Sequence, residues 1–143
     1  MVYQATHMPK TCGVDHVGLT VSDVIASRDF FVECFGWRQV GEKPEYPAVF
    51  VSDGQVTITL WQARNSDAFN EFNRHTNVGL HHLALRVENL DSLIELFERA
   101  SRWPGVKVEF GPEKMGPGPK RHAMFYEPGG VRIELDFAPP ANY

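Results

Sequence analysis

The feature that most constrains this sequence is that it repeats itself once. The segment DHVGLTVSDV (15–24) aligns without a gap with HHLALRVENL (81–90). A second pair, FVSDGQVTITL (50–60) and FYEPGGVRIEL (125–135), follows in the same order. Two matches in one order indicate a duplicated half, because a chance match has no reason to keep its order. Two copies are too few for a stacked array, so we expect the halves to pack together as one domain.

Each half is predicted to run from a strand into a helix and then into further strands. Residues 16–21 and 82–87 alternate between apolar and other side chains, which is typical of half-buried strands. Ser22 or Asp23, and Asn89 or Asp91, supply helix N-caps just after them. The sequence therefore predicts an α+β fold of two tandem βαβββ units. The expected boundaries are an N-terminal extension (1–12), a first unit (13–63), a linker (64–78) and a second unit (79–138).

Composition excludes several classes of protein. The chain has 143 residues, 43% of them hydrophobic, and a net charge of −4. Without a run of lysine and arginine, we expect no nucleic-acid partner. No apolar stretch is long enough for a membrane span, and the first dozen residues lack the apolar centre of a signal peptide. Two cysteines make no disulfide framework. These features predict a cytoplasmic protein with no membrane partner.

Strand alternation brings three metal-ligating residue types to one face of the sheet. If the apolar residues of the strands face the helices, then His16, His82 and Glu134 face the other side. Two histidines and one carboxylate form a ligand set that leaves open positions on a divalent metal ion. Such an ion can polarise a substrate oxygen as a Lewis acid. The sequence therefore predicts a metal site with these three ligands.

The same alternation selects side chains for a substrate pocket and sets others aside. It points His81 the other way, toward the apolar set. His122, at a strand start, is expected at the surface, and the alternative is a place at the mouth of the pocket. On the pocket face, Arg132 can bind an anionic group or pair with a carboxylate, and Asp136 is a candidate hydrogen-bond partner of a histidine. The residues predicted to contact substrate are Thr57, Thr59, Trp61, Arg86, Met124 and Tyr126.

Three segments in order resemble the vicinal oxygen chelate superfamily: DHVGLTVSDV, GLHHLALRVENLD and FYEPGGVRIEL. Its members include glyoxalase I, fosfomycin-resistance thiol transferases, extradiol dioxygenases and methylmalonyl-CoA epimerase. The resemblance implies paired βαβββ units that form a curled mixed sheet around a concave metal site. The ion would be held at the positions of His16, Thr59, His82 and Glu134. Thr59 replaces the glutamate of glyoxalase I, and a threonine is a poor metal ligand.

The resemblance also implies a function. We expect an enzyme that binds a small substrate through two adjacent oxygens on a divalent ion, with Fe²⁺ or Mn²⁺ favoured and Ni²⁺ or Zn²⁺ as alternatives. It would be a lyase, dioxygenase or transferase, and ring cleavage of the extradiol type or thiol transfer to fosfomycin is the alternative reaction. A further alternative is a metal-free binding protein of the bleomycin-resistance type. A homodimer is expected, and the metal ligands come either from one chain or from two.

Overall fold

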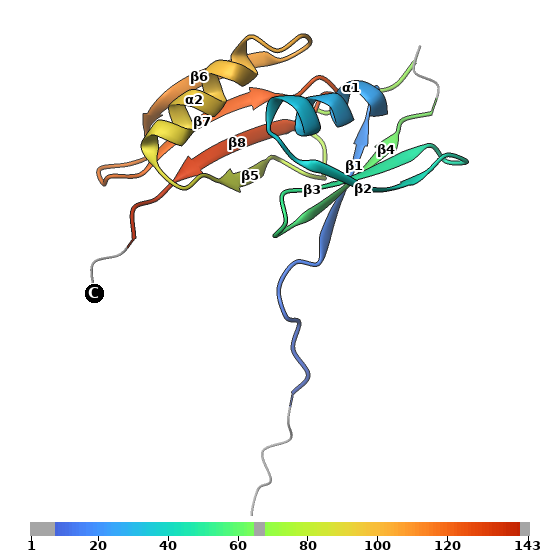
Figure 1. Ribbon diagram of the computed structural model, residues 1–143, viewed down its shortest axis with the longest axis horizontal. Helices are drawn as coiled ribbons and strands as arrows, with labels where there is room; N and C mark the ends of the chain where they lie inside the picture. Colours follow the sequence, from blue (N-terminus) through green and yellow to red (C-terminus); the bar gives the residue numbers. More distant parts are fainter. Residues whose placement is uncertain (1–7, 65–67, 141–143) are drawn as a thin grey trace, which may run out of the picture.

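The computed structural model describes residues 8–64 and 68–140. Residues 1–7 of the predicted extension and 65–67 of the predicted linker lie outside this part. The first half consists of β1 (His16–Val21), α1 (Val24–Asp29), the π-helical segment η1 (Phe30–Cys34), β2 (Arg38–Lys43), β3 (Ala48–Ser52) and β4 (Thr57–Gln62). The second half consists of β5 (Leu83–Arg86), α2 (Leu90–Ser101), β6 (Lys107–Lys114), β7 (Arg121–Tyr126) and β8 (Arg132–Phe137), as Figure 1 shows.

The two halves have the same topology. Their strand orders are β1-β4-β3-β2 and β5-β8-β7-β6. In each sheet the first strand pairs in parallel with the last, and the other neighbours are antiparallel. The predicted α+β fold of two βαβββ units is therefore confirmed. In the described residues each half keeps its own four-stranded sheet, so β1 and β5 are both edge strands.

Local sequence explains where most of these elements begin. The Asp23 carboxylate accepts hydrogen bonds from the backbone N–H groups of Ile25 and Ala26, and Asn89 accepts one from Ser92. These side chains satisfy donors that the first helical turn leaves unpaired. β2 is the first of the three strands expected after the helix. The sequence did not locate it, because its residues are mostly exposed and show no apolar alternation.

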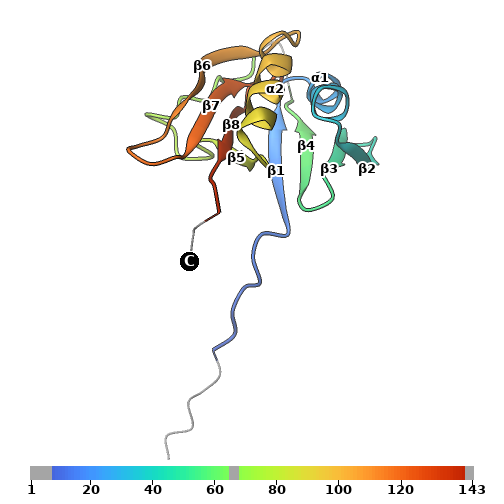
Figure 2. The ribbon, with the colours of Figure 1, turned by 60° about the vertical axis from the view of Figure 1, so that its left-hand side comes forward.

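The hydrophobic core joins the two halves through their helices. The helices lie on one side of the two sheets, as Figure 2 shows from a second direction. Phe30 of η1 is fully buried and packs edge-on against Phe125 of β7, with the ring centroids 5.8 Å apart. Burying one such side chain contributes about 2–3 kcal/mol. The opposite sheet faces carry the polar residues that the sequence analysis assigned to a site.

A buried carboxyl also joins the halves. Glu127, at the β7–β8 turn, accepts hydrogen bonds from the Ser27 hydroxyl of α1 (2.7 Å) and from the backbone N–H groups of Gly129 (2.8 Å) and Val131 (2.9 Å). Burial raises the pKa of Glu127, and these three donors only partly oppose that shift. We call Ser27, Glu127 and Gly129 the inter-half clamp.

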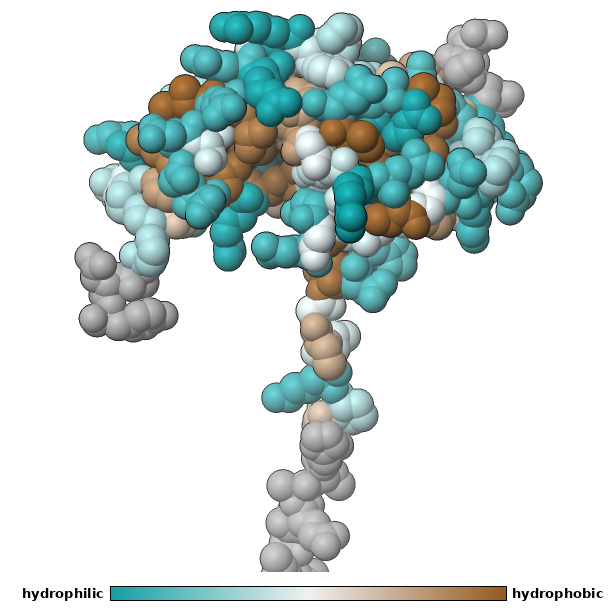
Figure 3. All heavy atoms as spheres, viewed as in Figure 1, coloured by the Kyte–Doolittle hydropathy of each residue, from teal (hydrophilic) through white to brown (hydrophobic). Residues whose placement is uncertain are grey.

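The surface is mixed in character. Figure 3 shows hydrophobic residues reaching the surface over both halves, interspersed with hydrophilic ones. Residues 8–15, ahead of β1, run away from the body (Figure 2), and Met8 and Val14 in this arm are exposed. Within residues 8–64 and 68–140, no helix combines the length and the apolar character needed to cross a membrane.

Candidate metal centre

Two of the three predicted metal ligands lie together on the second sheet. Glu134 is on β8, and His82 is the residue just before β5, which pairs with β8. The Nε2 atom of His82 is 3.0 Å from Oε2 of Glu134. The carboxylate is almost completely buried (side chain 5% exposed), whereas the imidazole is about one-third exposed (35%). The pair therefore presents a fixed carboxylate beside an imidazole that a solute can reach.

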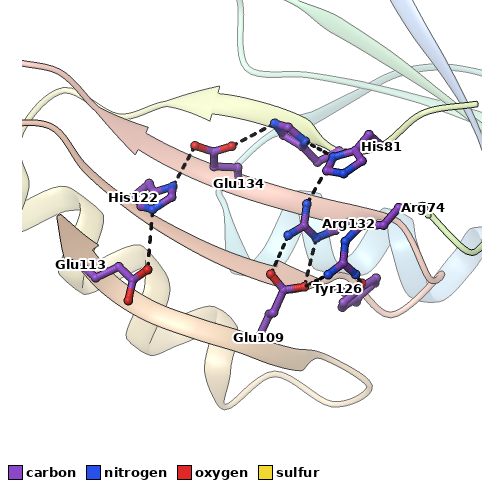
Figure 4. Close-up of polar contacts among 9 residues, drawn as sticks. Arg74, His81, Glu109, Glu113, His122, Tyr126, Arg132 and Glu134 are labelled. Atoms are coloured by element: carbon purple, nitrogen blue, oxygen red, sulfur yellow. Dashed lines mark hydrogen bonds and ion pairs between the residues drawn. The ribbon is translucent and has the colours of Figure 1, made fainter. Parts of the chain in front are cut away.

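A third side chain, His122 of β7, lies on the other side of Glu134, so that His82, Glu134 and His122 form a row. Its Nδ1 atom lies 3.1 Å from Oε1 of Glu134, and its Nε2 atom lies 3.8 Å from Oε1 of Glu113 on β6. The expectation that His122 lies at the surface is wrong, since its side chain is only 16% exposed. The alternation along β7 could have predicted this placement, because His122 lies on the same strand face as Met124 and Tyr126. The two oxygens of Glu134 are thus each engaged by an imidazole (Figure 4).

The predicted ligand His16 lies on the first sheet. Its imidazole is 56% exposed and contacts the Asp15 carboxylate at 2.7 Å. In the described part of the chain, no group of three or more His, Cys, Asp or Glu side chains has a geometry that can hold a metal ion. One chain therefore brings His82 and Glu134 together and leaves His16 apart from them.

The three predicted substrate contacts on β4 share the face of His16. Thr57 is opposite His16 and Thr59 is opposite Gly18 in the β1–β4 pairing. The Trp61 indole N–H donates a 2.8 Å hydrogen bond to the Thr59 hydroxyl oxygen. Thr59 is buried. The Trp61 ring packs against Tyr46 with the centroids 4.6 Å apart.

Beside Glu134 lies a second polar network, of which the sequence analysis predicted only that Arg132 could pair with a carboxylate. Arg74, from the predicted linker, donates a 2.9 Å hydrogen bond to the Tyr126 hydroxyl, and its Nη2 atom is 3.5 Å from Oε1 of Glu109. Arg132 donates through Nε and Nη2 to the two oxygens of Glu109, at 3.1 and 2.6 Å. These hydrogen bonds hold the pKa of Glu109 below its ordinary value. Figure 4 shows both arginines converging on this carboxylate.

His81 belongs to this network and not to the apolar face, which corrects the sequence expectation. Its Nδ1 atom is 2.7 Å from Nδ1 of His82 and 3.4 Å from Nη1 of Arg132. Alternation failed because β5 begins only at Leu83, so residues 81 and 82 are not on a pleated strand. The loss of water around its ring and the charge of Arg132 lower the pKa of His81.

The remaining predicted contacts are spread over the second sheet. Met124 is buried opposite Glu134 in the β7–β8 pairing, and the hydroxyl of Tyr126 is held by Arg74. Arg86 is exposed and borders a small recess of about 60 Å³ near Asp53. The Oδ1 atom of Asp136 is buried without a hydrogen-bond partner in the described residues, so the expected bond to a histidine does not form there.

Comparison with known proteins identifies the family. The family model for the glyoxalase/bleomycin resistance protein/dioxygenase superfamily matches residues 13–135. The chain belongs to this superfamily. It is the vicinal oxygen chelate superfamily expected from the sequence motifs. Its members include enzymes and commonly use divalent metals.

Similar proteins within the superfamily have diverse names. A curated protein from an Actinomyces species, 2-epi-5-epi-valiolone epimerase, is 29% identical over 150 aligned residues, covering 90% of this chain and 80% of that protein. Two solved structures share the fold. A glyoxalase/bleomycin resistance protein/dioxygenase domain from Frankia has a TM-score of 0.76 at 23% identity, covering 93% of this chain and 96% of that one. The fosfomycin resistance protein FosX from Listeria monocytogenes has a TM-score of 0.70 at 19% identity, covering 91% and 96%.

The spacing of the side-chain donor atoms can be compared with the spacing that a divalent metal ion requires. Two ligands on adjacent positions of an ion, each at about 2.1 Å, lie about 3 Å apart. The His82 Nε2 and Glu134 Oε2 atoms are separated by 3.0 Å. His122 on the other oxygen is the kind of outer partner that orients a ligating carboxylate. The residues of the second sheet therefore fit two adjacent positions of a divalent ion.

Proposed function

We propose that this protein is a divalent-metal-dependent enzyme that moves a proton next to the carbonyl of a small hydroxylated ketone, as an epimerase does. The observation that carries the proposal is the row of His82, Glu134 and His122, in which a buried carboxylate is flanked by two imidazoles. The relative named as an epimerase, aligned over 90% of this chain, supports the choice of reaction.

The ion, which we expect to be Fe²⁺ or Mn²⁺, would be held by His82 and Glu134. When bound, it would supply a Lewis acid for two adjacent substrate oxygens, a carbonyl and a neighbouring hydroxyl. Such a substrate needs no further anchor at Thr59, whose hydroxyl already accepts the Trp61 hydrogen bond. Trp61 and Thr57 of β4 would form the wall opposite the ion if the polar face of the first sheet meets the polar face of the second sheet.

His122 is the residue of this chain to which we assign proton transfer. Its Nδ1–H holds Glu134, so its Nε2 atom remains to accept a proton from the substrate carbon. The Glu113 carboxylate lies 3.8 Å from this Nε2 atom. The carbon–hydrogen bond breaks with its electrons left on the substrate, and the proton passes to Nε2 of His122. A proton from solvent water then adds to the opposite face, which gives the epimer, and the imidazolium releases its proton back to solvent. An imidazole suits general acid–base work near neutral pH.

We assign the third ligand to His16 of a second copy of the chain. The proposal is supported by the exposure of His16, Gly18 and Thr20 on β1 and by the edge positions of β1 and β5. A homodimer that joins these faces would bring an exposed imidazole to the His82–Glu134 pair.

Mixing two inactive variants tests this assignment. His16→Ala and His82→Ala should each abolish metal binding alone. Mixed dimers should regain one intact site, or roughly a quarter of all sites if the protomers pair at random. If both ligands came from one chain, the mixture would stay without metal.

The overall proposal is tested first by elemental mass spectrometry on protein purified without chelators and then reloaded anaerobically. We expect about one equivalent of metal per chain, one ion for each ligand set, and its loss in the His82→Ala variant. The reaction is tested by incubating the loaded protein in D₂O with 2-epi-5-epi-valiolone and, separately, with a phosphate ester of that ketone, and following deuterium uptake by NMR. No metal under any condition would contradict the proposal and favour a metal-free binding protein. Metal binding with oxygen consumption on catechols, or with thiol addition to fosfomycin, would assign the alternative reactions instead.

A further inference from the structure

A large cavity adjoins the candidate metal centre. Its volume is about 710 Å³, which is ample for a small-molecule ligand. It lies between the end of β1, the loop around residues 69–74 and the β7–β8 turn. Its wall includes His81, Tyr126 and Arg132. His81 contacts His82, and Arg132 lies two residues before Glu134 on β8. The cavity therefore opens beside the proposed ion and extends away from it.

The charges that line the cavity are unevenly distributed. Arg74, Lys107 and Arg132 are cationic, whereas the acidic lining residues are Glu71, which is exposed, and Glu127, whose two oxygens are already engaged in the inter-half clamp. Behind the wall, Glu109 is shared by Arg74 and Arg132. One carboxylate between two guanidinium groups leaves positive charge uncompensated.

The two arginines are also held in place. Glu109 fixes the Arg132 guanidinium through two hydrogen bonds, and the Tyr126 hydroxyl accepts one from Arg74. Lys107 makes no ion pair or side-chain hydrogen bond with the residues that the structure describes. Guanidinium and ammonium groups recognise oxyanions through charge-assisted hydrogen bonds, and the two arginines are already positioned to donate them.

We propose that this cavity binds an anionic substituent of the substrate, a phosphate ester or a carboxylate, through Arg74, Lys107 and Arg132. The inference rests on the proposed function, because it assigns the end of the substrate remote from the ion. Arg132 lies two residues before Glu134 on β8 and on the same face, which places the two about 7 Å apart along the strand. That distance suits a substrate whose adjacent oxygens and whose anionic group lie at opposite ends of one ring.

The test measures anion binding by itself, without turnover. Inorganic phosphate and acetate are titrated by calorimetry into the purified, metal-free full-length protein at fixed ionic strength. We expect saturable binding of at least one of these probes, weakened about 10-fold or more in Lys107→Ala by the loss of one charge-assisted contact. Lys107→Arg should keep most of the affinity. Lys120→Ala is the matched control, because it removes the same charge from an exposed residue that does not line the cavity.

Each outcome decides the proposal. Tighter phosphate binding assigns a phosphate ester, tighter acetate binding a carboxylate, and both support an oxyanion site. No saturable binding of either probe would overturn it, as would equal weakening by Lys107→Ala and Lys120→Ala, since that would reflect net charge alone. Because the titration needs neither metal nor turnover, its failure is distinguishable from failure of the proposed reaction.

Discussion

Gly129 occupies a position in the inter-half clamp that has no space for a side chain. A Cβ atom added there would lie 2.1 Å from Oγ of Ser27, 2.6 Å from Cβ of Val21 and 2.8 Å from Oε1 of Glu127. Ordinary contacts of a carbon atom are about 3.5 Å or longer, so all three neighbours would have to move. Val21 and Ser27 belong to the first half, and Glu127 belongs to the second. The Gly129→Ala substitution should therefore force the halves apart where they join.

The expected cost follows from two effects. Overpacking a filled core costs about 1–3 kcal/mol. Displacing Ser27 or Glu127 also weakens hydrogen bonds to a buried carboxyl, which costs about 1–3 kcal/mol more. We expect Gly129→Ala to lower the free energy of unfolding by about 3 kcal/mol or more, equivalent to a drop in Tm of about 10 °C for a domain of this size.

Thermal unfolding followed by circular dichroism measures this change. Gly118→Ala is the matched control, because nothing lies within 4 Å of a Cβ at that position and its backbone is not left-handed. The control should stay within about 0.5 kcal/mol of the parent protein. A Gly129→Ala protein that melts with the parent, or a Gly118→Ala protein that loses as much stability, would show that the halves are not joined tightly at this point.

Three further predictions concern the clamp and the candidate metal centre. His122→Ala should weaken metal binding by about 10–100-fold, because Glu134 loses the group that orients it, and competition with a chelating dye would measure this. An unchanged affinity for the metal would show that His122 does not orient Glu134 for metal binding. Ser27→Ala should cost about 1–3 kcal/mol in chemical denaturation by removing a donor to buried Glu127; an unchanged midpoint would argue against the clamp. The third prediction is a pH dependence. Since burial raises the pKa of Glu127, the folded state binds its proton more tightly than the unfolded chain does. Stability should therefore fall as pH rises from the ordinary value of 4.5 through the raised value, and Glu127→Gln should lack this slope. Parallel pH profiles for the two proteins would contradict the assignment.

The sequence by itself determined the architecture. The internal repeat predicted two equivalent halves, and alternation along the strands assigned buried and polar faces correctly for β1, β4, β7 and β8. Both features are local, because a strand's side chains alternate whatever it packs against. The same logic selected His82 and Glu134, which the fold then places 3.0 Å apart.

Tertiary structure decided which polar groups meet. Arg74 reaches Tyr126 and Glu109 from a loop without periodicity, so no pattern in the sequence foretold the contact. His81 turned toward Arg132 because β5 starts at Leu83, one residue later than the alternation implied. His16 lies apart from Glu134 because each half forms its own sheet. Alternation fixes the face on which a side chain lies, whereas the distance between two faces depends on how the halves pack, and that packing is set by core contacts such as the one between Phe30 and Phe125.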